Sequence, residues 1–273
     1  MAGAAPHCLP KPLRAASIRY LQVWTSMVME HFPIPAPAFG GASRRVEPGN
    51  AIDWLRQGWA IFIVNPGIWI AIMVLVIVIH VGLAIVPWIG PLASHLLTPL
   101  LAAGMLCACR KVAREEAPEI NDLFTGFRRH TGALVLLGVL YMLAMLGVFL
   151  LVFLFVGGGI AGGLLLGNPV GAGIAFGGIL LAALLWLVLS VPIVMAIWFA
   201  PALVVFNTMQ PVAALKASFN ACLKNAVVFL VYALIAMVLC FFAALPAGLG
   251  FLVLGPVLAG SVYASYRDIF ITA

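Results

Sequence analysis

The sequence predicts an all-α, polytopic membrane protein with about six transmembrane helices in three hairpins, each preceded by a short interfacial amphipathic helix. Hydrophobic residues make up 65% of the 273-residue chain, against about 45–50% in soluble domains. Charged residues make up 8%, against about 25% in soluble domains, which is too few to cover a surface in water. The apolar runs are long and do not alternate with polar residues, which favours helices over strands.

Residues 1–48 are predicted to form an extended or disordered segment on the cytoplasmic side, because proline and glycine are frequent in HFPIPAPAFGGASRRVEPGN. This segment contains no apolar region of about 7–15 residues, so we expect no secretory signal peptide. A further hypothesis is that translation starts at Met27 or Met29. Residues 49–273 are predicted to form the six-helix transmembrane domain.

Six apolar runs are long enough to cross a membrane, since a spanning helix needs about 20 mainly apolar residues. They lie near residues 67–87, 89–109, 132–156, 174–200, 225–246 and 248–266.

The charged residues predict how these runs are threaded. The fourteen Lys and Arg residues all lie before the first run, between the second and third, between the fourth and fifth, or after the sixth. The other connections, near 87–91, 157–173 and 246–250, carry no charge. Because basic loops stay in the cytoplasm, we expect a multi-pass protein of the bacterial inner membrane with both termini cytoplasmic. The net charge of +6 favours anionic lipid over nucleic acid as a partner.

A short amphipathic stretch precedes each predicted hairpin, at residues 52–66, 119–132 and 211–225. Each places aromatic or aliphatic residues beside basic ones at helical spacing, which is typical of helices that lie in the membrane interface. The chain is therefore interpreted as three units of interfacial helix plus hairpin. PLLAAGMLCACRK from Pro99 and PVLAGSVYASYRD from Pro256 align without gaps, which indicates an internal repeat or a chance likeness of small-residue helices.

Ten glycines lie between Val156 and Gly178, and they begin with a GxGxxG pattern. A dinucleotide site needs a strand before this pattern and an acidic residue about 20 residues later, and neither is present. Glycines also recur every four residues, at Gly159, Gly163, Gly167 and Gly171. Small residues at this spacing let helices pack closely. The glycines are expected either to pack an outer hairpin or to contact a partner or a second copy of the chain.

Few side chains are candidates for chemistry. His80 and His95 lie inside the first two apolar runs at similar depth, so they form an intramembrane polar pair or are two neutral imidazoles bonded locally. The runs carry no charged side chain, which speaks against ion-coupled carriers and acid–base catalysis at membrane depth. The five cysteines indicate neither a disulfide framework nor a metal site. We therefore expect no catalytic residue, metal or cofactor.

Five segments carry a resemblance to a known family: RVEPGNAIDWLRQGWAIFIVNPGIWI, LLTPLLAAGMLCACR, DLFTGF, ALKASFNACLKN and VLGPVLAGSVYASYRDIF. On these segments, residues 46–270 resemble a family of uncharacterised six-helix bacterial inner-membrane proteins, mostly proteobacterial. The layout is also distantly similar to the membrane domain of glycerophosphodiester phosphodiesterases, whose catalytic residues lie in a separate soluble domain. The resemblance therefore implies a membrane location, and it supplies no assigned activity or catalytic residue to carry over.

Two functions are compatible with these features. The first is a non-enzymatic accessory, assembly or structural subunit that binds lipids, other membrane-protein subunits or itself. The alternative is a permease or channel for a small, weakly polar molecule. A carrier needs a polar cavity near the midplane of the membrane, and the predicted midplane residues are nearly all Leu, Val, Ile, Ala and Gly, which favours the first.

Overall fold

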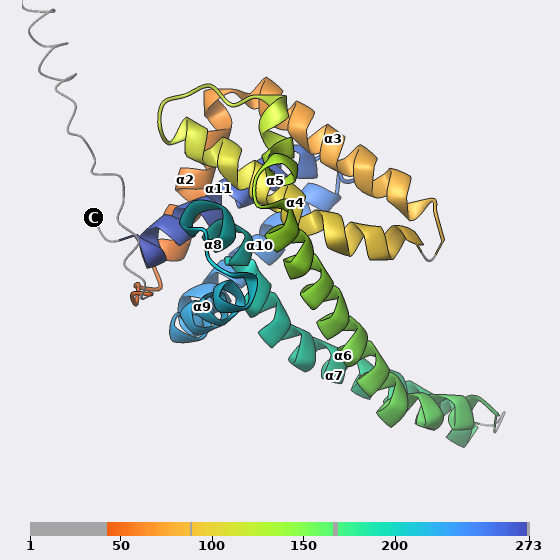
Figure 1. Cartoon of the computed structure of the whole chain (residues 1–273). Coiled ribbons are helices and arrows are strands. Elements are labelled where there is room, and N and C mark those ends of the chain that lie inside the picture. The colour runs from red at the N-terminus through yellow and green to blue at the C-terminus, as the bar shows by residue number, and fades with distance from the viewer. Residues whose placement is uncertain (1–42, 88, 166–168, 272–273) are drawn as a thin grey trace, which may run out of the picture. The chain divides into compact units, whose positions relative to one another are not determined.

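The structure, a computed structural model, describes residues 43–87, 89–165 and 169–271. In this part of the chain the regular elements are all helices, as the sequence predicts (Figure 1). Most of the predicted extended segment, residues 1–42, lies outside the described residues. Residues 43–47 are not helical, and the backbone N–H of Arg44 donates to the carbonyl of Ile269 across 2.9 Å.

The helices follow one another with short connections. In chain order they are α2 (Asn50–Val64), α3 (Pro66–Ala84), α4 (Ile89–Val112), the 3₁₀ helix η1 (Ile120–Phe124), α5 (Thr125–Arg128), α6 (Thr131–Leu165), α7 (Pro169–Trp198), α8 (Ala200–Asn207), α9 (Pro211–Lys224), α10 (Ala226–Ala244) and α11 (Phe251–Phe270).

Five helical stretches are long and apolar enough to cross a membrane. They are Pro66–Ala84, Ile89–Val112, Thr131–Leu165, Pro169–Asn207 and Ala226–Ala244. The sixth predicted run, 248–266, corresponds to α11, which is not among them, so the predicted six-helix hairpin arrangement is not confirmed. The difference has a physical reason. Arg267 and Asp268 lie in the last turns of α11, and eleven of its residues are buried against other helices, so it resembles a helix of a protein core.

The three predicted amphipathic stretches take different forms. Helices α2 and α9 match the expected positions closely. The stretch 119–132 is not one helix, because it folds as η1 followed by the single turn α5. Glu119 and Asp122 form a capping box that fixes the start of η1. In all three stretches a buried face lies against protein rather than lipid, as the burial of Trp54, Leu123 and Ala214 shows.

The second and third amphipathic elements each pack on the second helix of the preceding hairpin. The pair η1 and α5 packs on α4, and α9 packs on α7. The first element, α2, packs on the last helix, α11. The three units therefore form a closed cycle in which the beginning of the described chain meets its end. Each of the second helices α4, α7 and α11 also has an internal proline.

Glycines permit two of these contacts. A Cβ atom at Gly58 of α2 would lie 2.2 Å from the carbonyl oxygen of Val257, the residue after Pro256. A Cβ atom at Gly126 of α5 would lie 2.4 Å from the carbonyl oxygen of Leu100, the residue after Pro99. Leu100 and Val257 correspond in the gapless alignment of the two prolines, so the predicted repeat has an equivalent contact in both units.

The core lies where the ends of α2, α4, α8, α10 and α11 meet. Trp54, Phe199 and Tyr266 are among the fully or nearly fully buried side chains there. By contrast, α6 and α7 form a hairpin whose main contact is with each other (Figure 1). Most of its large apolar side chains are exposed, as expected for surfaces that face lipid.

Replacement of Gly58 by alanine is expected to destabilise the fold by about 1–3 kcal/mol, because the new methyl group meets the rigid backbone of α11. Thermal unfolding of the purified protein in detergent would measure the change. Gly82→Ala is the matched control, since a Cβ atom there meets nothing within 4 Å. An unchanged melting temperature in Gly58→Ala would contradict the packing described here.

Candidate functional site

A polar hub joins the described beginning of the chain to its end. The Oδ2 atom of Asp268 accepts hydrogen bonds from Asn50 Nδ2 at 2.8 Å and from Trp54 Nε1 at 2.9 Å. Its Oδ1 atom is paired with the guanidinium group of Arg44. Burial alone would raise the pKa of Asp268, but hydrogen bonds from Asn50, Trp54 and Arg44 and the charge of Arg44 outweigh it and lower the pKa.

Asn225 completes this hub from the junction of α9 and α10. Its side-chain oxygen accepts from the backbone N–H of Val46 at 2.9 Å. Its amide nitrogen donates to the carbonyls of Arg44 and Ala221, both at 3.0 Å. The polar side chains of the hub are therefore occupied in joining the segment before α2 to the last three helices.

Ser218 of α9 has a similar role where α7 ends and α8 begins. Its hydroxyl donates to the carbonyl of Met195 at 2.7 Å and accepts from the backbone N–H of Phe199 at 3.0 Å. It thereby satisfies backbone groups at the break between the two helices. Ser218 is completely buried, so α9 is fixed to α7 by a polar contact where the other two units have a glycine.

The two predicted histidines each have a local partner. His80 Nδ1 lies 2.9 Å from the carbonyl of Val76, and His95 Nδ1 lies 2.7 Å from the carbonyl of Pro91. Each is a contact with the preceding turn of its own helix. The ring of His95 also stacks on Tyr141 of α6, with centroids 5.5 Å apart. The geometry therefore accounts for the two imidazoles locally, and their role as a polar pair stays a prediction.

The predicted glycine ridge lies in the α6–α7 hairpin. A Cβ atom at Gly163 would lie 2.7 Å from the carbonyl oxygen of Gly171 and from the backbone nitrogen of Ala175, so Gly163 and Gly171 bring the two helices together. Gly159 lies within α6, and Gly167 lies outside the described residues. Contact of these glycines with a partner stays a prediction.

Other glycines of the same hairpin face open space. A Cβ atom at Gly158 or Gly162 of α6, or at Gly173 or Gly177 of α7, would meet nothing within 4 Å. Both pairs have the four-residue spacing of close helix contacts. The sequence alone does not distinguish these four glycines, because which glycines face inward depends on how the two helices are rotated about their axes.

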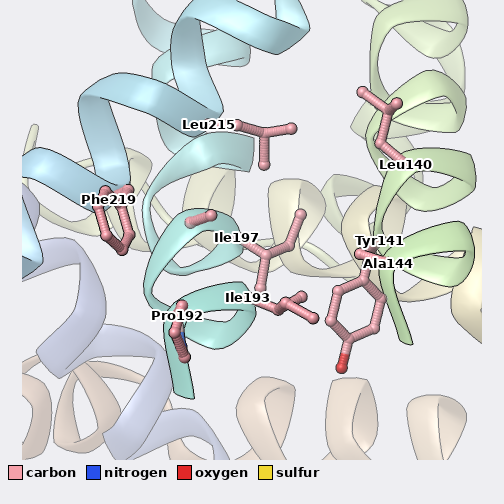
Figure 2. Close-up of a pocket in the computed structure, with 9 residues that line it drawn as sticks. Leu140, Tyr141, Ala144, Pro192, Ile193, Ile197, Leu215 and Phe219 are labelled. Carbon is pink, nitrogen blue, oxygen red and sulfur yellow. The ribbon is translucent and has the colours of Figure 1, made fainter. Parts of the chain in front are cut away.

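A shallow groove of about 210 Å³ lies between α6, α7 and α9. Figure 2 shows Tyr141 of α6 beside Ile193 and Ile197 of α7, with Leu215 and Phe219 of α9 at the other side. The lining is apolar except for the Tyr141 hydroxyl, so the groove suits an apolar ligand or a lipid chain rather than a charged substrate.

The described part of the chain contains no group of three or more His, Cys, Asp or Glu side chains placed to hold a metal ion. Cys107 and Cys109 are buried in α4 among apolar side chains.

The residues that matter most to the architecture, Asp268, Asn225 and Ser218, were not predicted as site residues. One sequence signal could have pointed to Ser218: Leu-x-x-Gly/Ser-aromatic occurs at Leu55–Trp59, Leu123–Phe127 and Leu215–Phe219.

Acid is expected to weaken the polar hub. The pKa of Asp268 lies below its ordinary value of 3.8 in the folded protein. The charged hub therefore stabilises the fold above that ordinary value, and this contribution is lost as the pH falls through the lowered pKa. Melting temperatures measured across this range should fall less steeply in Asp268→Asn than in the wild type. Asp53→Asn is the control, because Asp53 forms only an exposed pair with Arg56. Identical pH profiles for all three proteins would contradict this role of Asp268.

Comparisons with known proteins agree with the membrane character of the structure. A probable inner membrane protein of Burkholderia thailandensis is 34% identical over 218 residues, which cover 77% of this chain and 79% of the relative. No family model matches the chain, and no solved structure matches it. The similarity to the membrane domain of glycerophosphodiester phosphodiesterases stays a prediction. The chain belongs to the family of this probable inner membrane protein.

Proposed function

We propose that the protein is a non-enzymatic accessory, assembly or structural subunit of the inner membrane, and that it contacts another integral membrane protein through its α6–α7 hairpin. The observation that carries this proposal is the length of the hairpin. Helix α6 has 35 residues and α7 has 30, whereas α3 and α10 have 19 each.

The shorter helices match a bilayer and the longer ones exceed it. At 1.5 Å per residue, α3 and α10 are about 28 Å long, close to the hydrocarbon thickness of about 30 Å. Helix α6 is about 52 Å long. A tilt of about 40°, the upper end of the usual range, still leaves it about 40 Å along the membrane normal. Tilt alone therefore does not bring α6 to the hydrocarbon thickness.

The excess length is apolar. Leu164 and Leu165 at the end of α6 are 67% and 87% exposed, and Val170 at the start of α7 is 69% exposed. The sequence contains no Asp, Glu, Lys or Arg between Arg129 and Lys216. Apolar side chains beyond the hydrocarbon region are costly in water. Cover by the apolar surface of another membrane protein, or of a second copy, would remove this cost.

We further propose that the chain crosses the membrane six times, with both ends in the cytoplasm. Arg44 and Ile269 are hydrogen-bonded to one another, so they lie on the same side, and the chain between them crosses an even number of times. The five candidate spans are an odd number, and α11 supplies the sixth crossing. The polar and small residues of α11 are compatible with a membrane crossing, since other helices cover them. The basic residues place these ends in the cytoplasm.

Reporter fusions at the two termini test this topology. A fluorescent protein that folds only in the cytoplasm should be active at residue 1 and at residue 273, and alkaline phosphatase, which is active only outside it, should be inactive at both. Phosphatase activity at one terminus alone would mean that α11 does not cross.

Site-specific photo-cross-linking tests the partner contact. A photoreactive residue in place of Leu165 should give a protein adduct in native membranes, which mass spectrometry would identify. The control position is Val78 of α3, which is 59% exposed and lies in a helix that fits the bilayer, so it should give lipid adducts alone. Lipid adducts alone at Leu165 as well would contradict the proposal.

The permease or channel is the second candidate, and the groove beside Tyr141 is the observation that favours it. Pro192 lies inside α7 at this groove, and a helix that contains a proline can bend during transport. Solute flux into liposomes that is lost in Tyr141→Phe or His95→Ala, together with an absence of partner adducts, would support this candidate over the accessory subunit.

A further inference from the structure

Three arginines gather at the ends of α4 and α11. Arg110 lies in the last turn of α4, Arg114 follows this helix, and Arg267 lies in the last turn of α11. Helix α4 packs on α11, so these ends lie in one region of the molecule. Arg267 follows Tyr263 by four residues, about one helical turn, and Tyr263 is a side chain of α11 that is 7% exposed.

An aromatic platform holds the first of these arginines. The guanidinium carbon of Arg110 lies 4.4 Å from the centre of the Phe206 ring, at the end of α8. Phe206 packs edge-on against Tyr263, with centroids 6.0 Å apart, and at a tilt against Tyr266, with centroids 5.4 Å apart. The Tyr266 hydroxyl donates to Asn207 Oδ1 at 2.5 Å. Arg110 is therefore held in place before any ligand binds, which lowers the entropy cost of binding.

Three of the nearby carboxylates form ion pairs with other side chains. Asp268 pairs with Arg44, and Lys111 pairs with both Glu119 and Asp122. Within residues 43–271, leaving aside the short gaps, none of the three guanidinium groups forms an ion pair.

Exposed Glu115 and Glu116 follow Arg114 in the turn after α4, without pairing with it. Arginines near helix C-termini also complement the helix dipole. That effect acts on each helix separately and does not explain why two helices that pack on one another both end in an arginine.

The depth of the cluster matches the headgroup region of a membrane. Arg110 lies 21 residues after the first residue of α4, or about 32 Å along the helix, against about 30 Å of hydrocarbon. Phosphate groups of lipids lie just outside the hydrocarbon. The guanidinium group donates two parallel hydrogen bonds to phosphate oxygens, which makes arginine the preferred side chain for this group.

We propose that Arg110, Arg114 and Arg267 form a binding site for a phosphate group, supplied either by an anionic lipid headgroup or by free phosphate. The Phe206 ring orients Arg110 from one side and packs on Tyr263, which lies one helical turn before Arg267. Arg110 and Arg267 correspond in the internal repeat, so the site uses the equivalent ends of two second helices. It shares no residue with the α6–α7 hairpin, and its failure would leave the proposed partner contact standing.

The test measures lipid binding to the purified full-length protein by native mass spectrometry. Phosphatidylglycerol and cardiolipin are the anionic probes, phosphatidylcholine is the neutral one, and inorganic phosphate is the free competitor. The site variant is Arg110→Gln, Arg114→Gln and Arg267→Gln together. The control variant, Arg45→Gln, Arg56→Gln and Arg128→Gln, removes the same charge elsewhere. Thermal unfolding confirms that each variant is folded.

The site variant should bind the anionic lipids at least about tenfold more weakly than the wild type, because each charge-assisted hydrogen bond contributes more than a tenfold change. The control variant should bind like the wild type. Displacement of lipid by millimolar inorganic phosphate would identify free phosphate as the source, and resistance to it would identify the lipid headgroup. Equal weakening in both variants would overturn the proposal, because it would show general attraction alone.

Two further variants keep the test decisive if the triple glutamine variant does not fold. Arg114→Gln changes an exposed residue outside the helices, so it leaves the packing intact and should weaken anionic lipid binding. Replacement of the three arginines by lysine keeps the charge but removes the paired hydrogen bonds, and it should weaken binding less than glutamine does. Unchanged binding in both would overturn the proposal.

Discussion

The close approach of α2 to α11 is the contact on which the rest of the architecture depends. Gly58 lets the two backbones touch, and the Asp268 hub fixes the register of that contact. Helices in lipid gain little from burying apolar surface, since the lipid tails are equally apolar, so close packing and polar contacts must hold them together. This contact also closes the cycle of three units. Without it, α2 and α11 would be separate ends of an open chain of hairpins.

Polar and apolar side chains accordingly lie in different parts of the helices and make different contacts. Asn225, Ser218 and Asp268 hold together the ends of the helices. The middle parts of α3, α6, α7 and α10 have almost no polar side chain and contact lipid. The same division explains why α11 differs from the other long helices. It is covered by protein, so its polar side chains can hydrogen-bond to neighbouring helices, as Ser261 does with Tyr232 of α10 at 2.6 Å.

Composition and periodicity were enough to predict the helical membrane class, the long apolar helices and the position of α9. They did not predict that the amphipathic faces pack on protein, because a buried face and a lipid-bound face have the same apolar pattern. The sequence also did not predict which glycines of the α6–α7 hairpin face inward. Gly162 and Gly163 are neighbours of the same type, and they differ only in the direction in which each faces from the helix. The contact between residues 44 and 269 joins opposite ends of the chain, and local patterns carry no information on it.

The departures from the three-unit cycle are the places where function is to be sought. Contacts that recur, such as Gly58 on Val257 and Gly126 on Leu100, build the scaffold and are explained by packing alone. The excess length of α6 and α7 has no counterpart in the other two hairpins. The paired arginines at the ends of α4 and α11 have none at the end of α7, where Trp198 leads directly into α8. Packing requires neither feature, so both agree with the contacts outside the chain that we propose for them.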